Sequence, residues 1–567
     1  GSHISHISKI IGESHFNLTN YTEAIPFLLA YKGEKGQWNN NDYYQLGYAY
    51  YMQKDYISAI SWFNKIVSGA DAVAQNASYH LADCYLKTVN KTAALNAFRK
   101  ASQMDFNTSI KEDAFYNYAL LSYDIGNPYN NVAQVLIRFL KTYPNHAEHT
   151  TINTLLINAF MRSKDYKGAL SYFKNASDLE SQKTYQKAAY FYGVQLFLES
   201  NYETAITNFS KAIAVKINND IHAKSIFWRG EANYRTANYN KALDDFLTVS
   251  KNQISAINSV NYNLGYTYFK IKDYQNAIIY FNRFIAKNPS DKEQLDDSYV
   301  RLGDSYFATS NYTNAVTFFD KVQVENSSNT VYALYQKALS FGFLNQNDNK
   351  IKSLNSLINQ YPQSRLYDDA LYELGNTYLK TNQTELALQA YATLIDAPKR
   401  SPFKPKALLK KGLIYYNQND NESALAIYKR LVKDFNNAPE SRQAVKNAKE
   451  IYSDLGQIDL YEIWVKDIGF VTETDEALDK AMYHSAEKFF LQNNFSKTTT
   501  AFKKYLNRFP EGLNTLEAHF YSAQSFINLK QNDDAIAHLE SVIAQPDNIF
   551  TEQGLSTLAL LYLEKTD

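Results

Sequence analysis

Two apolar patterns of helical period follow each other along residues 258–289, and a short polar segment separates them. The first pattern consists of Tyr262, Leu264, Tyr266, Tyr268 and Phe269, and the second of Ile278, Phe281 and Ile285. Apolar residues three and four positions apart lie on one face of an α-helix. The separating segment, residues 270–273, suits a tight turn, and Pro289 cannot continue a helix. The pattern therefore predicts two antiparallel helices joined by a short turn.

Two small residues, Gly265 and Ala277, stand one in each predicted helix. A glycine in a helix interior costs about 1 kcal/mol relative to alanine, so this position needs a packing reason. Small side chains at a helix crossing let the two backbones approach closely. We therefore expect Gly265 and Ala277 to mark the crossing, with Tyr268, Tyr274 and Phe281 filling the space around it.

The spacing of six residues resembles the tetratricopeptide repeat, whose signature is L-G-x2-Y, then A-x3-F, then P. These residues are Leu264, Gly265, Tyr268, Ala277, Phe281 and Pro289. The resemblance implies an all-α, right-handed superhelical solenoid of about fifteen helix-turn-helix units. In such a solenoid each helix pair packs on its neighbours, which creates a continuous core and an extended concave surface.

The small residue of the second helix recurs along the whole chain at intervals of 35 to 38 residues. Its positions are Ala24, Ala59, Ala94, Val132, Ala169, Ala205, Ala242, Ala277, Ala315, Lys350, Ala387, Ala424, Leu460, Thr498 and Ala535. Val132, Lys350 and Leu460 mark degenerate copies. The register predicts helix pairs from end to end, with no strand and no long linker.

Four segments follow from this register. Residues 1–3 look like a cloning scar. Residues 4–436 are predicted to form the repeat solenoid, and residues 437–480 a degenerate unit that could be a boundary within it. Residues 481–567 are predicted to hold further units. The last unit reads as a first helix without its partner, so we expect the chain to be part of a longer protein.

Charge and hydropathy exclude several classes of protein. The 58 basic and 58 acidic residues balance, whereas a general nucleic-acid binder needs a basic excess or stripe. No apolar run reaches the roughly 18 residues that a membrane helix needs. The single cysteine, Cys84, excludes an internal disulfide framework. We therefore expect no nucleic-acid partner and no transmembrane segment in this chain.

No catalytic constellation occurs in the sequence. It has no HExxH motif, no phosphate-binding glycine loop and no GxSxG nucleophile motif. His146 and His149 are close in sequence, but neither a cysteine nor a carboxylate cluster accompanies them, so a polar turn is favoured over a metal site. We expect a non-enzymatic protein without cofactor or metal.

The family resemblance implies which residues face the groove. They lie three residues before, one after and four after the first-helix glycine. On that basis the candidate peptide-binding residues are Tyr44, Tyr48, Tyr51, Tyr79, Tyr190, Phe197, Phe227, Tyr262, Tyr266, Phe269, Tyr372 and Asn376. Equivalent positions hold Asp83, Glu231, Tyr234, Asp304 and Phe307. Aromatic rings supply large contact area to a bound peptide, but the alternative is that these rings fill the seams between helices.

Chaperone-binding members of the family grip a C-terminal carboxylate with lysine, arginine and asparagine. Asn376 stands at one such position, but Tyr372 occupies the position where the lysine is needed. The sequence therefore does not support that clamp.

Several junctions between units also resemble tetratricopeptide proteins of the bacterial cell envelope. Examples are Tyr361-Pro362 followed by Leu374-Gly375, and Phe509-Pro510. The resemblance implies a scaffold that binds protein or peptide segments of other envelope proteins, in the periplasm or at the outer membrane, with membrane association through a partner or a missing lipid anchor. The alternatives are a carbohydrate- or peptidoglycan-binding protein, the assembly domain of a larger enzyme, and a cytoplasmic location.

Overall fold

The computed structural model describes residues 2–66, 69–251, 259–323 and 327–566. It divides into two compact units, Gly1–Ile271 and Lys272–Asp567. Of the segments considered above, Gly1 of the predicted cloning scar and Asn258 lie outside the described residues.

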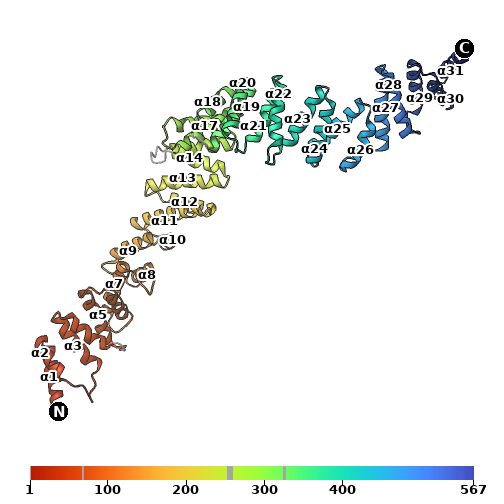
Figure 1. The fold of residues 1–567 in the computed structure, drawn as a ribbon. Coiled ribbons are helices and arrows are strands. Elements are labelled where there is room, and N and C mark those ends of the chain that lie inside the picture. The colour runs from red at the N-terminus through yellow and green to blue at the C-terminus, as the bar shows by residue number, and fades with distance from the viewer. Residues whose placement is uncertain (1, 67–68, 252–258, 324–326, 567) are drawn as a thin grey trace. The chain divides into compact units, whose positions relative to one another are not determined.

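The first unit contains α1 to α15, together with a short 3₁₀ helix (Asn64–Ile66) (Figure 1). Their bounds are α1 Ser2–Asn17, α2 Tyr21–Ala30, α3 Asn40–Met52, α4 Tyr56–Phe63, α5 Ala72–Lys87, α6 Lys91–Ser102, α7 Thr108–Ile125, α8 Val132–Thr142, α9 His149–Arg162, α10 Tyr166–Phe173, α11 Leu179–Leu198, α12 Tyr202–Ala214, α13 Asn219–Arg235, α14 Tyr239–Lys251 and α15 Val260–Lys270.

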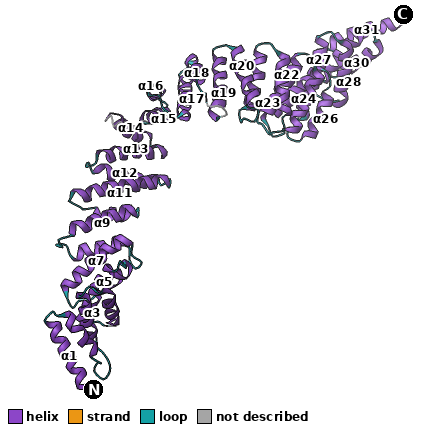
Figure 2. Ribbon diagram, turned by 60° about the vertical axis from the view of Figure 1, so that its left-hand side comes forward, coloured by secondary structure: helices purple, strands orange, loops and turns teal. Residues whose placement is uncertain are grey.

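The second unit contains α16 to α31. Their bounds are α16 Tyr274–Ile285, α17 Lys292–Ala308, α18 Tyr312–Phe319, α19 Ser328–Phe343, α20 Asn347–Gln360, α21 Tyr367–Lys380, α22 Thr384–Asp396, α23 Phe403–Asn417, α24 Asn421–Asp434, α25 Pro439–Asp454, α26 Ile458–Ile468, α27 Asp475–Leu491, α28 Phe495–Arg508, α29 Thr515–Asn528, α30 Asn532–Ile543 and α31 Thr551–Thr566. Figure 2 shows helices joined by loops; within the described ranges the only β feature is an isolated bridge between Glu34 and Gln37.

Helices pack in consecutive pairs within each unit, from α1–α2 to α13–α14 in the first unit and from α17–α18 to α29–α30 in the second, and the odd-numbered helix is the first of each pair. First helices of successive pairs also touch one another, as α3 touches α5, α11 touches α13 and α17 touches α19. This second contact is what joins the pairs into a stack. The predicted all-α solenoid of tetratricopeptide-type helix pairs is confirmed.

The turn within a pair is short because one residue reverses the chain and the next caps the second helix. Between α3 and α4, Lys54 adopts a left-handed conformation with φ 63°, which reverses the chain. Asp55 follows as the N-cap of α4, and its side chain accepts a hydrogen bond from the Ser58 amide at 3.1 Å. Positive φ angles recur at the same place in other turns, for example at Ser200, Ala237 and Ser310.

Glycine marks the crossing within a pair, as predicted. A Cβ added to Gly230 in α13 would lie 2.8 Å from Cε1 of Phe246 in α14, and one added to Gly193 in α11 would lie 2.6 Å from Cε1 of Phe209. Both rings are fully buried. The missing side chain is therefore replaced by the aromatic ring of the second helix, which is the packing reason that the sequence required.

The structure corrects the register in two degenerate copies. In α8 the buried residue at the fourth helical position is Val135, not Val132, because the helix begins at Val132. In α26 the predicted mark, Leu460, is 45% exposed, and Tyr461 takes the buried position instead. Neither segment has a small residue at this point, so nothing in the sequence marks the register there.

Residues 437–480 contain an ordinary helix pair, α25 and α26. Their buried side chains, including Ile451 and Val465, belong to one hydrophobic core that extends from Leu371 in α21 to Ala518 in α29. The boundary suggested for this segment stays a prediction.

Candidate functional site

The predicted groove residues all lie in first helices, namely α3, α5, α11, α13, α15 and α21. All twelve are half-buried, so none is a fully exposed platform and none is a sealed core residue. The structure brings them together in small groups, each formed by one helix pair and its neighbour. Whether these groups bind a partner stays a prediction.

Rings three residues before the glycine position pack on the aromatic side chain of the second helix. Examples are Tyr44–Phe63 (5.9 Å between ring centroids), Tyr79–Phe98 (5.9 Å), Tyr190–Phe209 (6.3 Å), Phe227–Phe246 (5.7 Å) and Tyr372–Tyr391 (6.1 Å). The inner edge of each ring therefore supports the crossing, while its half-buried position leaves part of it accessible.

Rings four residues after the glycine pack against the aromatic residue that opens the second helix. The pairs are Tyr51–Tyr56 (6.1 Å), Phe197–Tyr202 (5.2 Å), Tyr234–Tyr239 (5.5 Å) and Phe307–Tyr312 (5.3 Å). Each pair spans the turn of its unit. This position has a structural role that the family resemblance did not indicate.

One histidine at the start of the chain was missed by the sequence analysis. The ring of His80 in α5 lies 5.0 Å from the rings of Tyr48 and Tyr51 in α3, measured between centroids. Its Nδ1 is buried and has no hydrogen-bond partner among the described residues. Burial lowers the pKa of His80 to about 4, which keeps the ring neutral at physiological pH. Nothing in the sequence around this lone histidine predicts that its ring packs against Tyr48 and Tyr51.

In four units the residue directly after the glycine position is polar and accepts a hydrogen bond from another helix. The Tyr51 hydroxyl donates to Asp83 at 2.8 Å and the Tyr332 hydroxyl donates to Asp304 at 3.0 Å. The Tyr391 hydroxyl donates to Oδ1 of Asn376 at 2.8 Å, and the Asn263 amide donates to Glu231. These bonds connect different helices, three of them between successive units.

A cavity of about 220 Å³ opens between α13 and α15. It is lined by Glu231, Tyr234, Arg235, Tyr262, Asn263 and Tyr266. Four of these residues occupy groove positions expected from the sequence, and two of them, Tyr262 and Tyr266, were singled out there. Their ring centroids lie 5.0 Å apart. We call this cavity the α13–α15 pocket.

The electrostatics of the α13–α15 pocket centre on Glu231. Burial raises the pKa of Glu231, and the positive charge of Arg235, one helical turn later, opposes that rise. Asn263 donates to the carboxylate with its amide nitrogen, but its Oδ1 is buried and accepts no hydrogen bond from the described residues. The pocket thus presents a carboxylate between tyrosine rings.

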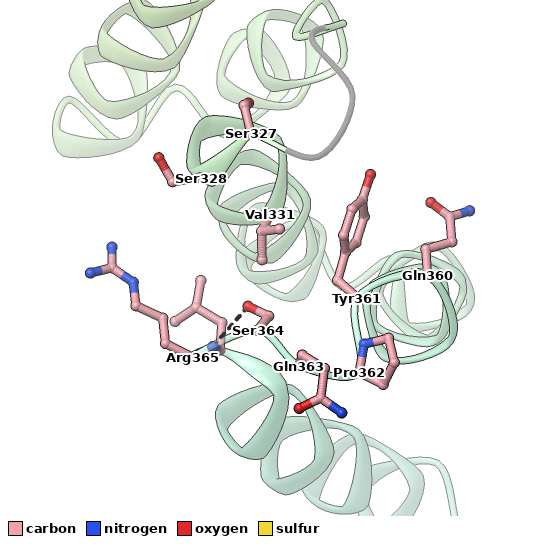
Figure 3. A pocket seen from close by; sticks show the side chains of 10 residues that line it. Ser327, Ser328, Val331, Gln360, Tyr361, Pro362, Gln363, Ser364 and Arg365 are labelled. Atoms are coloured by element: carbon pink, nitrogen blue, oxygen red, sulfur yellow. Dashed lines mark hydrogen bonds between the residues drawn. The ribbon is translucent and has the colours of Figure 1, made fainter.

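Two larger cavities lie at the aromatic–proline junctions of the second unit. One, of about 540 Å³, is lined by the start of α19 and by residues 360–366 (Figure 3). The other, of about 620 Å³, is formed by the start of α27 and residues 508–513. Ser364 accepts a hydrogen bond from the Leu366 amide at 3.1 Å and holds the first loop in shape. The lining differs in charge, because the first contains Arg365 and serines while the second contains Asp475, Glu476 and Glu511.

The described residues show neither a membrane-spanning helix nor a metal-binding cluster. None of the helices described is long and apolar enough to cross a membrane. In the same residues no group of three or more histidine, cysteine or acidic side chains is arranged to hold a metal ion. Cys84 is buried and makes no disulfide.

Family models match three parts of the chain. Tetratricopeptide repeat models match residues 372–439 and 517–548, and the model of an outer membrane lipoprotein family, YfiO, matches residues 219–365. We find no curated protein that matches the chain.

Solved structures with a similar arrangement of helices are also tetratricopeptide repeat proteins. One from Parabacteroides merdae is 17% identical, with 46% of this chain and 97% of that chain covered and a TM-score of 0.31. YrrB, described as having an unusual peptide-binding site, is 21% identical, with 33% and 91% covered and a TM-score of 0.28. The C-terminal part of a protein from Cytophaga hutchinsonii is 17% identical, with 51% and 98% covered and a TM-score of 0.27.

The repeat models fall on the same helix pairs in which the glycine–aromatic crossing is seen, such as Gly375 against Tyr391. The same crossing recurs in pairs outside the matched residues, such as Gly193 against Phe209. The chain is therefore built of tetratricopeptide-type helix pairs, and tetratricopeptide repeat models match two segments of it.

Proposed function

We propose that the chain is a non-enzymatic scaffold that binds segments of partner proteins along the faces of its first helices. The repeat architecture is that of a protein-interaction scaffold, and the matching family models describe repeat and lipoprotein families rather than enzymes. The α13–α15 pocket carries the proposal for this chain. It is a concave, tyrosine-lined site at groove positions, and the Glu231 carboxylate lines it.

The chemistry of the face suits a peptide. Half-buried tyrosines such as Tyr262 and Tyr266 offer both a ring surface and a hydroxyl, and they lose little conformational entropy on binding. Polar groups between them, such as Glu231 and Asn263, can fix the register of a bound segment. Rings already held in place by their neighbours bind without a large ordering cost.

We place this scaffold in the bacterial cell envelope, where its partners are segments of other envelope proteins. The match of residues 219–365 to an outer membrane lipoprotein family supports this location, and the matched residues include α13 and α15. A periplasmic or outer-membrane-associated complex for assembly or secretion is the function that these observations favour.

A competition experiment tests the class of ligand. The protein is titrated with peptides selected from a random library and, separately, with peptidoglycan fragments and oligosaccharides. We expect peptides to bind, and the double variant Tyr262→Ala with Tyr266→Ala to lose that binding while its thermal midpoint stays near that of the wild type. Tyr129→Ala is the matched control, because Tyr129 is a 49% exposed tyrosine in a loop outside the first helices. Binding of glycans alone, abolished by the double variant, would contradict the scaffold proposal.

A further inference from the structure

We propose that the α13–α15 pocket receives a positively charged side chain, lysine or arginine, of the bound segment. The inference deepens the proposed function and rests on it, because it names which side chain of a partner enters this pocket. It is argued from the acceptors, the walls and the charge balance of the pocket.

The Glu231 carboxylate lines the α13–α15 pocket and has few donors of its own. It receives a hydrogen bond from Asn263 and makes no ion pair among the described residues. A half-buried carboxylate with few donors is costly, and a charged donor recovers more of that cost than a neutral one. An ammonium or guanidinium group carries several donors at once and can bond to both carboxylate oxygens.

The walls of the α13–α15 pocket also favour a cation. Tyr234, Tyr262 and Tyr266 surround the acceptors, and the face of a tyrosine ring attracts a cation within about 6 Å. The aliphatic stem of lysine or arginine can pack along the same rings. At about 220 Å³ the pocket is smaller than the roughly 300–1,000 Å³ of typical small-molecule sites. Its size therefore fits one side chain.

The charged groups that line the pocket favour a cation over an anion. A carboxylate in this pocket would face the Glu231 carboxylate, and Arg235 is exposed at the rim and not ion-paired with Glu231. In contrast, two other acidic groups of the chain already have their own cation. Asp245 pairs with Arg229 at 2.7 Å and Asp304 pairs with Arg301 at 2.6 Å. Glu231 is the half-buried carboxylate that a partner's cation can complete.

The test uses single-residue probes and therefore needs no known partner. N-acetyl-lysine methylamide and N-acetyl-arginine methylamide are titrated by NMR, next to the norleucine and glutamate analogues. We expect the cationic probes to bind more tightly than norleucine, Glu231→Gln to weaken them by about tenfold, and Arg235→Gln to strengthen them severalfold because it removes a like charge. Asp304→Asn is the matched control and leaves their affinity unchanged.

The outcomes separate this inference from the proposed function. Equal affinity for the norleucine and lysine probes, or a preference for the glutamate probe that Arg235→Gln abolishes, would overturn the cation assignment. Library peptides that bind equally well after every lysine and arginine is replaced by norleucine would overturn it too, and the scaffold proposal would stand. Failure of all peptides to bind would overturn the scaffold proposal, and the single-residue probes would still decide the chemistry of the pocket. Circular dichroism melts of each variant verify that it folds.

Discussion

Glu231 and Asp304 occupy the same position of the repeat, directly after the glycines Gly230 and Gly303, yet their surroundings differ. Asp304 accepts a hydrogen bond from the Tyr332 hydroxyl at 3.0 Å and pairs with Arg301 at 2.6 Å. Among the described residues Glu231 receives a hydrogen bond from the Asn263 amide alone, and it lines a cavity. Burial raises the pKa of both carboxyl groups. The Asp304 carboxylate is thus paired within the fold, and we propose that a ligand pairs with the Glu231 carboxylate.

The difference arises from the next first helix along the chain. In α19 that helix brings a long tyrosine hydroxyl to the carboxylate, and in α15 it brings a short asparagine. The tyrosine completes the Asp304 carboxylate, whereas the α13–α15 pocket lies beside the bond that the asparagine makes to Glu231. The same repeat position therefore serves stability in one pair and, on our account, recognition in another.

The largest effect on stability is expected at the glycine–aromatic crossing, which occurs in both helix pairs. A side chain at Gly303 would overlap the ring of Phe319, and one at Gly230 would meet the ring of Phe246. We expect Gly303→Leu and Gly230→Leu each to destabilise the fold by about 1–3 kcal/mol, the usual cost of overpacking. Thermal and urea melts measure the change. Midpoints equal to that of the exposed-site variant Ile57→Leu would show that neither glycine marks a tight crossing.

Removing the hydroxyl that completes Asp304 is expected to have the next largest effect. Tyr332→Phe leaves the buried carboxylate with one donor fewer, which costs about 1–2 kcal/mol of stability. The variant should also raise the pKa of Asp304 further, because the lost hydrogen bond favours the charged form. Urea melts measure the free energy of unfolding, and Tyr129→Phe is the exposed control. Equal losses of stability in the two variants would contradict the role given to the Tyr332 hydroxyl.

The pH dependence of stability reports on the ionisation of Glu231. Because its pKa is raised in the folded protein, its contribution to stability is fully present below the ordinary glutamate pKa and is lost as the pH rises through the folded value. Asn263 and Arg235 are the groups that face it. We therefore expect Glu231→Gln to be more stabilising, relative to the wild type, at pH 7 than at pH 4. A difference of opposite sign would mean that the carboxylate is stabilised by a partner within the fold.

The smallest effects on stability are expected from substituting the two arginines. Their difference tests whether Glu231 and Asp304 have different surroundings. Arg235 is exposed and forms no ion pair with Glu231, so Arg235→Gln should change stability by no more than about 0.5 kcal/mol. Arg301→Gln should cost more, because it removes a cation at 2.6 Å from a half-buried carboxylate. Equal costs in urea melts would remove the distinction between the two sites.

The fold could be predicted because every unit needs the same contacts in order to stack. Gly193, Gly230 and Gly375 recur with their aromatic partners at one spacing, and the structure places each glycine at its crossing. The register failed by a few residues at Val132 and Leu460, where no small side chain marks the crossing.

The candidate site was predictable only in part. Periodicity places Tyr262 and Tyr266 on one helix face, but it carries no information about the neighbouring pair. The Tyr332–Asp304 bond joins residues 28 apart, and the Asn263–Glu231 bond joins residues 32 apart. Such contacts are set by the spacing of successive helices. For the same reason the sequence did not reveal that Tyr51 and Phe197 brace the turns of their own units.

Hydrogen–deuterium exchange, with and without a library-selected peptide, tests the central claim most directly. Our account predicts slower amide exchange in α13 and α15 when the peptide is bound, no comparable change in α17 and α19, and loss of the effect in the Tyr262→Ala and Tyr266→Ala double variant. Protection confined to α17 and α19, or protection of α13 and α15 that persists in the double variant, would contradict the claim that the face around Glu231 is the one open to a partner.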